Sequence, residues 1–290
     1  METIHTIEWM KQAARRARAE GQLVGLIPTM GALHHGHAAL IRAARRDCSP
    51  VVVSIFVNPK QFGPGEDLAK YPRALDTDRA LLESEGVDYL FAPAAAEIYP
   101  PGFRSYVEVE ELSKRLEGRS RPGHFRGVAT VVLKLFQIVQ PWRAYFGRKD
   151  AQQARIIGQM ASDLNLDTEI VVCPIVREAD GLAMSSRNAY LKPDERAAAT
   201  VLHRALAAAR DQIASGERDT ARLVAAMRRV IAQEPLAAAD YVEIVDAQTF
   251  EPIVRLGGAC LGVMAVFFGA TRLIDNMLIE EDKESFRVSL

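Results

Sequence analysis

The sequence predicts an α/β protein, with a doubly wound, mostly parallel sheet followed by a smaller α+β domain. Short apolar runs alternate with amphipathic segments up to about residue 180, which is the pattern of β–α units that build a parallel sheet. Beyond that point, an alanine-rich helical stretch precedes three strand-like runs. A chain of 290 residues is long enough for two domains. We therefore expect domains at 1–180 and 181–290.

Each element of the first domain is predicted from a local pattern. Apolar, β-branched runs that close at a proline indicate buried strands, as in the run that ends at Pro59. Apolar residues at helical spacing indicate helices, and Gly86 and Pro141 are expected to end two of them. The predicted helices are 37–47, 71–86, 124–141 and 151–164; the predicted strands are 21–29, 49–59, 87–93, an outer strand at 104–112, the first part of 142–150, and 167–178.

The C-terminal part follows a different pattern, with helices first and strands after them. Segments 192–216 and 217–233 are predicted helices, and 240–253, 259–271 and 272–280 are predicted strands. The longest apolar stretch of the chain lies in the middle one of these strands. It is too short to span a bilayer, so it indicates a core strand.

Charge and cysteine content exclude several classes of protein. Lys and Arg total 36 and Asp and Glu total 37, a formal net charge of −1, whereas a general nucleic-acid binder carries a basic excess. Cys48, Cys173 and Cys260 form no CxxC motif, so we expect a reducing cytoplasm and no disulfide framework. The N-terminal segment lacks the apolar core of a signal peptide. We therefore expect a cytoplasmic protein with no nucleic-acid or membrane partner.

The stretch PTMGALHHGHAAL (28–40) places His34, His35 and His37, half of the chain's 6 histidines, between a strand-like and a helix-like run. In a parallel sheet, such a turn lies at the carboxyl edge of the strand, where ligands bind. Free backbone N–H groups and the positive end of the helix would suit phosphate there. Side chains at i and i+3 can also share one face of the first helical turn. A solvated turn or a weak metal site is the alternative.

Two further clusters have the chemistry to contact a phosphate. FGRKDAQQ (146–153) places Lys149 at a second strand-to-helix turn. GLAMSSRNAYL (181–191) groups Ser185, Ser186 and Arg187, and a guanidinium binds two phosphate oxygens at once. An exposed turn lysine and a helix N-cap with a surface arginine are the alternatives. No GxGxxG follows the first strand and no GxxxxGK[ST] occurs, so these common nucleotide signatures are absent.

The segment 57–78 is a loop-rich stretch that follows a predicted strand. Asn58 and Gln61 carry amides that can hold a carboxylate or hydroxyl without adding charge. Asp78 could reach Mg²⁺, a cation that prefers oxygen ligands. A polar residue in the first turn of a helix is the alternative for Asp78, and it is the favoured interpretation of Asp76.

The HxGH core formed by His34, Gly36 and His37 resembles the motif of the nucleotidylyltransferase superfamily, which implies a Rossmann-like sheet with ATP at the first strand–helix turn. Together with VVVSIFVNPKQFGPGEDLAKYPR, HFRGVATVVLKLFQIVQP, FGRKDAQQ and DGLAMSSRNAYL, in this order, it resembles the pantothenate synthetase family over about residues 20–195. The resemblance implies a ligase that adenylates (R)-pantoate with ATP, releases pyrophosphate, and passes pantoyl adenylate to β-alanine, giving pantothenate and AMP. It also implies Mg²⁺ and a homodimer.

The resemblance assigns roles to individual residues. His34, His37, Lys149 and Arg187 are expected to act in catalysis, with His37 as proton donor. Pantoate or β-alanine is expected to contact Gln61, Gln153, Asn58 and Arg126, and the metal to contact Asp78. The C-terminal domain is expected to act as a lid. The expected ATP contacts are Met30, Gly31, Ala32, Leu33, His34, His35, Gly36, His37, Gly147, Arg148, Lys149, Asp150, Val176, Met184, Ser185, Ser186 and Arg187.

Arg148 and Thr77 depart from the family pattern, in which an acid is common at both positions. Two other functions compete with the ligase. A plain nucleotidylyltransferase would join a nucleotide to a phosphate or alcohol acceptor, without an amine and without ending in AMP. A non-catalytic module would bind ATP without releasing pyrophosphate. The joint presence of the histidine, lysine and Ser-Ser-Arg clusters favours an enzyme over such a module.

Overall fold

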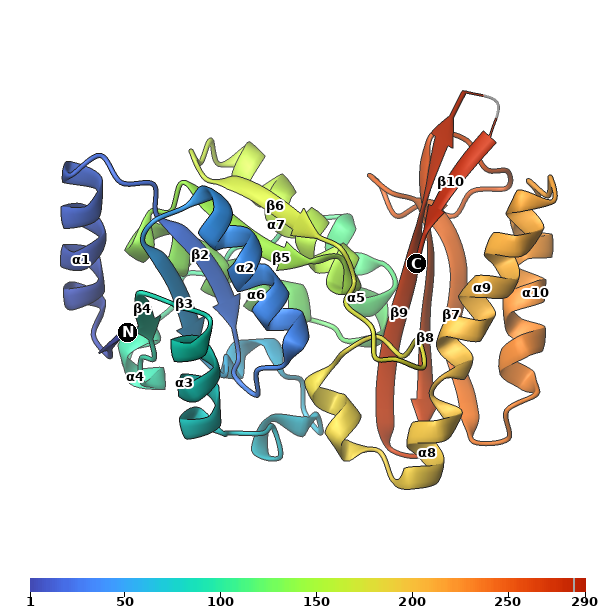
Figure 1. Cartoon of the computed structure of the whole chain (residues 1–290), viewed down its shortest axis with the longest axis horizontal. Helices are drawn as coiled ribbons and strands as arrows, with labels where there is room; N and C mark the ends of the chain where they lie inside the picture. Colours follow the sequence, from blue (N-terminus) through green and yellow to red (C-terminus); the bar gives the residue numbers. More distant parts are fainter. Residues whose placement is uncertain (284) are drawn as a thin grey trace. The chain divides into compact units, whose positions relative to one another are not determined.

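The computed structural model describes residues 1–283 and 285–290. It divides into two compact units, Met1–Pro174 and Ile175–Leu290. Each unit contains its own sheet (Figure 1).

The first unit is a parallel sheet of six strands in the order β1-β4-β3-β2-β5-β6. The chain runs outward from β2 through β3 to β4 and then returns to β5, on the other side of β2. The strand order therefore reverses between β2 and β5, and open α/β sheets bind ligands at such a reversal. The strands are β1 (Glu2–Ile4), β2 (Gly25–Thr29), β3 (Val51–Ile55), β4 (Tyr89–Phe91), β5 (Arg143–Gly147) and β6 (Glu169–Cys173).

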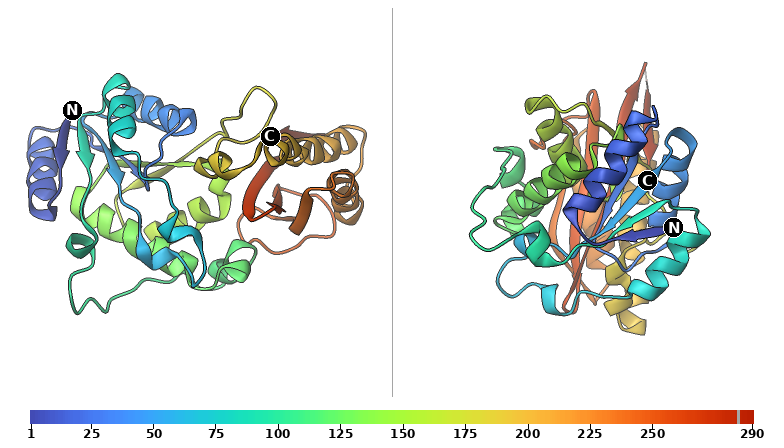
Figure 2. Two further views of the ribbon diagram at one scale, coloured as in Figure 1. Left: turned by 90° about the horizontal axis from the view of Figure 1, so that it is seen from below. Right: turned by 90° about the vertical axis from the view of Figure 1, so that its left-hand side faces the viewer.

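Helices cover both faces of this sheet, with α2 and α3 on one face and α6 and α7 on the other (Figure 2). The central strands are therefore buried on both sides, which is why they are continuous apolar runs. The helices are α1 (Ile7–Ala19), α2 (His35–Asp47), α3 (Leu75–Ser84), α4 (Ala95–Ile98), α5 (Glu117–Ser120), α6 (His124–Val139) and α7 (Ala151–Asp163); the 3₁₀ helices are η1 (Pro59–Gln61), η2 (Asp67–Ala69), η3 (Leu112–Lys114) and η4 (Arg148–Asp150).

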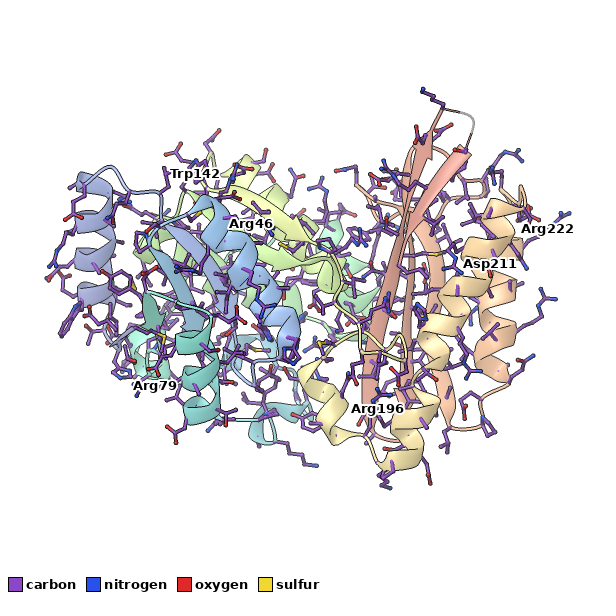
Figure 3. All side chains as sticks on the ribbon, viewed as in Figure 1. Arg46, Arg79, Trp142, Arg196, Asp211 and Arg222 are labelled. Carbon is purple, nitrogen blue, oxygen red and sulfur yellow. The ribbon has the colours of Figure 1, made fainter. Side chains whose placement is uncertain are left out.

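The second unit is an antiparallel sheet in the order β10-β9-β8-β7, with two long helices packed on it. Leu206 and Met227 of these helices share a buried core with Met264 of the sheet. Their opposite faces are polar, and Asp211 and Arg222 point outward (Figure 3). The elements are η5 (Ser186–Tyr190), α8 (Pro193–Ala198), α9 (Val201–Ala214), α10 (Thr220–Ala232), β7 (Ala237–Asp246), β8 (Ala259–Phe268), β9 (Thr271–Asp282) and β10 (Ser285–Ser289).

The predicted fold class is confirmed, and most predicted elements form. The outer strand predicted at 104–112 is wrong, because this segment lies along a helix instead of a strand: the Val107 N–H donates to Thr130 Oγ1 of α6 at 3.0 Å. The single helix predicted at 192–216 is wrong too. Thr200 Oγ1 donates to the Ala197 carbonyl at 2.8 Å, a side-chain bond that competes with the helical ladder, and the chain breaks there into α8 and α9. Three elements, β1, α1 and β10, were not predicted from the sequence.

Over the described part of the chain, no helix combines the length and the apolar character needed to cross a bilayer. All three cysteines are free thiols and buried.

Candidate active site

Three connections meet at the carboxyl edge of the first sheet, where β3, β2 and β5 lie side by side. The connection after β3 carries Gln61, that after β2 carries Met30 and His37, and that after β5 carries Lys149. Gln61 Nε2 donates to Met30 Sδ at 3.2 Å, which joins the first two connections. The third connection follows β5, the neighbour of β2 in the sheet, so it begins at the same edge. The charge of Lys149 contributes to a lowered pKa of His37. Residues that are far apart in the sequence therefore converge where the strand order reverses.

His34 and His37 form a ring pair at the start of α2, with centroids 4.2 Å apart and ring planes tilted by 46°. His34 is the N-cap, and its Nδ1 accepts the Gly36 N–H at 3.1 Å. Nδ1 of His37 accepts the His34 N–H at 3.2 Å. A neutral imidazole that accepts at Nδ1 carries its proton on Nε2. Both rings therefore offer an Nε2–H donor. The prediction that the two side chains share one face of the first helical turn is confirmed by their ring contact.

His37 is neutral under ordinary conditions. Burial lowers its pKa to about 3, and the neighbouring His34 and Lys149 act in the same direction. A neutral ring donates a hydrogen bond but holds no extra proton to release at neutral pH. The role of His37 as proton donor stays a prediction.

The expectation that free backbone N–H groups of this turn bind phosphate is wrong for most of its residues. The Gly31 N–H donates to Thr29 Oγ1 at 3.2 Å, and the His37 and Ala38 N–H groups donate to the His34 carbonyl at 2.8 and 3.1 Å. Internal acceptors hold the N–H groups of Gly31, Ala32, Leu33, His34, Gly36, His37 and Ala38. Side chains are therefore the main donors that the turn offers to an anion, supported by the positive end of α2.

The amide of Gln61 is fixed in one orientation by a buried network. Asn58 Nδ2 donates to Gln61 Oε1 at 3.0 Å and to the Gly127 carbonyl at 3.1 Å. Oδ1 of Asn58 accepts the Lys60 N–H at 3.2 Å, and because a backbone N–H only donates, this contact settles which end of the Asn58 amide is nitrogen. The Tyr99 hydroxyl also donates to Asn58 Oδ1, at 2.9 Å. Since Gln61 Oε1 is already an acceptor, its Nε2 is the atom left to donate a further hydrogen bond. Such a donor suits a carboxylate or hydroxyl oxygen.

A second network, which the sequence analysis missed, holds the backbone of Gln61. Arg121 forms a forked ion pair with Glu66, at 2.9 and 2.7 Å, and its Nη1 lies 3.1 Å from His124 Nε2. A guanidinium only donates, so Nε2 of His124 accepts and its Nδ1–H donates to the Gln61 carbonyl at 2.9 Å. Burial lowers the pKa of His124 to about 4. The stretch RPGHFRG (121–127) predicts only the start of a helix and gives no sign of this network.

The connection after β5 contributes Lys149 from η4, and α7 follows it directly. Gln152 is buried and structural: its Nε2 donates to the carbonyls of Leu112 and Arg115 at 2.8 and 2.9 Å. Gln153, at the next position, is partly exposed. Arg126 is exposed and lies over the Tyr106 ring, with Cζ 3.9 Å from its centroid. The substrate contacts expected for Gln153 and Arg126 stay predictions.

The Ser185–Arg187 cluster lies in the second unit. The Met184 N–H donates to the Val176 carbonyl at 2.9 Å, and Ser185 caps η5 by accepting the Arg187 N–H at 3.2 Å. The alternative interpretation of this cluster as a helix cap is therefore correct for Ser185. The ATP contacts expected for Val176, Met184, Ser185, Ser186 and Arg187 stay predictions.

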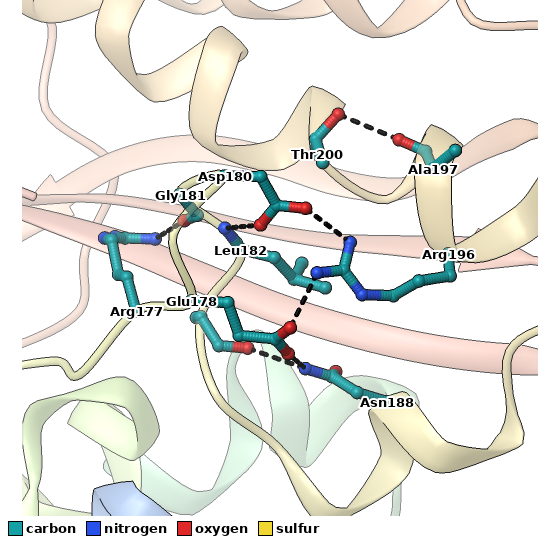
Figure 4. Close-up of polar contacts among 10 residues, drawn as sticks. Arg177, Glu178, Asp180, Gly181, Leu182, Asn188, Arg196, Ala197 and Thr200 are labelled. Atoms are coloured by element: carbon teal, nitrogen blue, oxygen red, sulfur yellow. Dashed lines mark hydrogen bonds and ion pairs between the residues drawn. The ribbon is translucent and has the colours of Figure 1, made fainter.

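An ionic network holds the segment that carries this cluster (Figure 4). Arg196 of α8 donates to Glu178 at 2.6 Å and pairs with Asp180 at 2.8 Å. Asn188 Nδ2 donates to the same Glu178 carboxylate at 2.8 Å. The two ends of the segment 178–188 therefore meet at the Glu178 carboxylate, which Asn188 and Arg196 both contact.

Asp78 does not present an open metal ligand. Its side chain is buried, with the residue 2% exposed, and its two carboxylate oxygens accept the backbone N–H groups of Ala32 and Leu33 at 2.9 and 2.7 Å. Mg²⁺ dehydrates reluctantly and keeps several water molecules when bound, so this buried carboxylate does not fit it. Among the side chains that the structure describes, no group of three or more His, Cys, Asp or Glu residues is placed to hold a metal ion.

Comparison with known proteins gives one consistent result. A family model described as "Pantoate-beta-alanine ligase" matches residues 2–278. The pantothenate synthetase of Heliobacterium modesticaldum is 58% identical over 280 residues, covering 97% of this chain and 100% of the relative. The crystal structure of pantothenate synthetase from Thermus thermophilus superposes with a TM-score of 0.91 at 48% identity, covering 95% of this chain and 98% of that one.

A further solved structure is the pantoate-beta-alanine ligase of Francisella tularensis, described as complexed with Beta-gamma ATP and Beta-alanine. It has a TM-score of 0.78 and 36% identity, and the match covers 96% of this chain and 97% of that one. The family model and the relatives each span nearly the whole chain. The chain therefore belongs to the pantoate-beta-alanine ligase family.

Proposed function

We propose that this protein condenses pantoate with β-alanine at the expense of ATP, through an enzyme-bound pantoyl adenylate. The observation that carries the proposal is the convergence of two neutral imidazole Nε2–H donors, a lysine and an oriented glutamine amide at the edge where β2 and β5 diverge. This edge is where open α/β sheets bind nucleotides. Membership of the family supports the choice of substrates.

The first step would make the pantoate carboxylate a usable acyl donor. A carboxylate oxygen attacks the α-phosphorus of ATP, a P–O bond forms, and the bond to the bridging oxygen breaks, so that pyrophosphate leaves. Negative charge moves onto the leaving phosphate in the transition state. Fixed donors aimed at that charge lower the barrier without reorganising, and Nε2–H of His34 and His37 with the ammonium of Lys149 would supply them.

The second step would form the amide. The free amine of β-alanine attacks the acyl carbon of pantoyl adenylate, the C–O bond to AMP breaks, and the nitrogen loses one proton to solvent. The acyl phosphate is already activated, so the protein mainly has to position the amine, which is worth several kcal/mol. Gln61 Nε2–H would hold a substrate oxygen for this purpose without being a charge or a competing nucleophile.

Mg²⁺ would accompany ATP as the counterion of its triphosphate. The roles proposed above for the protein's own residues do not depend on it. We also propose a cytoplasmic homodimer, as the family resemblance implies, and sedimentation velocity of the purified chain tests the dimer. The lid role expected for residues 181–290 remains a prediction.

The decisive experiment is ATP–pyrophosphate exchange. We expect exchange that requires pantoate and does not require β-alanine, followed by release of AMP and pantothenate once β-alanine is added. A plain nucleotidylyltransferase would yield a stable nucleotide-containing product and no AMP. A non-catalytic module would bind ATP and show no exchange with any pantoate concentration, and this result would refute the proposal.

A further inference from the structure

The connection between β2 and α2 has an uncommon backbone. Gly31 and Ala32 both have positive φ, +85° and +52°. Glycine adopts such values readily, whereas only a few per cent of other residues do. The histidine pair begins two residues later, so the direction in which His34 and His37 point depends on this left-handed stretch.

One side chain from a different element stabilises that backbone. Asp78 lies in the first turn of α3, more than 40 positions away in the sequence, and its two oxygens accept two consecutive N–H groups, Ala32 to Oδ2 at 2.9 Å and Leu33 to Oδ1 at 2.7 Å. A Cβ on Gly31 would lie 3.0 Å from Asp78 Oδ2, so the carboxylate packs directly against the turn. Hydrogen bonds to an ionised acceptor are about twice as strong as neutral ones.

The same contacts argue against Asp78 as a metal ligand. The carboxylate is enclosed, at 2% exposure, and both oxygens face backbone donors. The N–H groups of Ala32 and Leu33 point their positive ends at the carboxylate, and such donors repel a cation. The first turn of α3 also carries Asp76, but that residue is exposed.

We propose that Asp78 is a positioning residue: it fixes the positive-φ turn at Gly31–Ala32, and through it the direction of the His34 and His37 rings, and it does not bind Mg²⁺. This inference rests on the proposed function only for its activity measurements. Its structural content concerns the free protein and can be tested without substrates.

The activity test compares Asp78→Asn with Asp76→Asn, its exposed neighbour. The amide keeps the size of the carboxylate but leaves one backbone N–H without an acceptor, so we expect kcat of pyrophosphate exchange to fall by about 10-fold or more. The Mg²⁺ concentration for half-maximal activity should stay within about 2-fold of wild type, because no ligand is lost. Asp76→Asn should match wild type in both. A 10-fold rise in the Mg²⁺ requirement of Asp78→Asn, with kcat restored at high Mg²⁺, would overturn the proposal.

A second substitution separates positioning from any other role. Glycine adopts positive φ without cost, so Ala32→Gly added to Asp78→Asn should recover about 3-fold or more of the lost kcat. The loss of a metal ligand would not be repaired by a glycine in the turn. Absence of any recovery therefore counts against the proposal.

Two measurements on the free protein complete the test and need no activity. Amide hydrogen exchange of Ala32 and Leu33 should be slow in wild type and about 10-fold or more faster in Asp78→Asn. Mn²⁺ added to nucleotide-free wild-type protein should leave the amide resonances of Ala32 and Leu33 sharp, and this holds even if Asp78→Asn does not fold. Broadening of these two resonances at stoichiometric Mn²⁺ would overturn the proposal. If wild type itself showed no pyrophosphate exchange, the proposed function would fail while these two readouts would still decide the role of Asp78.

Discussion

Nδ1 of His37 accepts the backbone N–H of His34 at 3.2 Å, and this contact decides which proton His37 presents to a ligand. The ring must carry its proton on Nε2, and burial together with the neighbouring His34 and Lys149 keeps it from taking a second one. The sequence motif HxGH therefore encodes a pair of neutral donors whose direction is set by the helix cap.

His37→Ala should lower kcat/KM for pantoate adenylation by about 10²-fold, the scale of losing one donor to a transition-state charge. His37→Gln is the matched control, because its Nε2 lies near the position of the imidazole Nε2, and it should retain more activity than the alanine variant. The pKa of His37 is about 3, far below the ordinary histidine value of about 6.5. Titration of His37 should therefore cause no change in wild-type activity near pH 6.5. A limb at that pH that disappears in His37→Gln would contradict the neutral-donor role.

The rate of amide formation should rise with pH as β-alanine loses its proton. Single-turnover amide formation from preformed pantoyl adenylate, measured over about pH 6.5–9.5, should increase steadily through the range of amine pKa values. Gln61→Ala should weaken both half-reactions through binding and leave the shape of this profile unchanged. A bell-shaped profile with an enzyme group near pH 7 that is lost on substitution of His37 would instead make His37 a general base.

His124 should make the fold sensitive to acid. Its pKa falls from 6.5 in the unfolded chain to about 4 in the fold, so between these values the unfolded chain binds a proton that the folded chain excludes, and stability falls as pH falls. The free energy of unfolding should lose about 2 kcal/mol from this residue between about pH 7.5 and 5.0. His124→Asn keeps a donor toward Gln61 but cannot take up a proton. In urea unfolding over the same pH range, the loss in its free energy of unfolding should be smaller than that of wild type by about 2 kcal/mol. An equal loss in both proteins would refute this assignment.

Gly127 and Gly158 offer a matched pair of helix positions with opposite expected outcomes. A Cβ on Gly127 would lie 2.2 Å from the Lys60 carbonyl, whereas one on Gly158 of α7 meets nothing within 4 Å. Gly127→Ala should therefore push α6 away from η1, costing about 2 kcal/mol of stability and raising KM for pantoate through Gln61. Gly158→Ala should add about 0.5–1 kcal/mol from helix propensity and leave KM unchanged. Thermal denaturation and steady-state kinetics of both variants measure this difference, and similar behaviour would show that the approach of α6 to η1 is not tight.

Arg196 should control the order of the Ser185–Arg187 segment. Arg196→Ala removes its contacts with Glu178 and Asp180, so amide hydrogen exchange over 182–188 should speed up by about 10-fold, and KM for ATP should rise more than kcat falls. Arg204→Ala removes a long pair between an exposed arginine and the half-buried Glu234, at 3.9 Å, and serves as control, because such long pairs contribute little. Unchanged exchange in Arg196→Ala would show that the network does not hold the segment.

The sequence by itself determined the fold class and predicted where the candidate site lies. The period of apolar residues is a local property, so strands such as β3 and helices such as α7 could be predicted from their own residues. The turn that carries His34 and His37 could likewise be placed at a sheet edge, because a strand and a helix flank it directly. Segment 104–112 shows the limit of this reasoning: its alternating pattern suits a strand, but a hydrogen bond from Val107 to Thr130, supplied by a distant helix, holds it outside the sheet.

Only the tertiary structure decided how the site residues are oriented. Hydrogen bonds join three pairs of residues from segments far apart in the chain: Asp78 with Ala32, Gln61 with Met30, and His124 with Gln61. A single sequence carries no signal for which donor meets which acceptor across such distances. The protonation of His37 and the commitment of Asp78 to the backbone follow from those contacts and from burial, because the surroundings of a side chain, and not its type, set its charge and its partners.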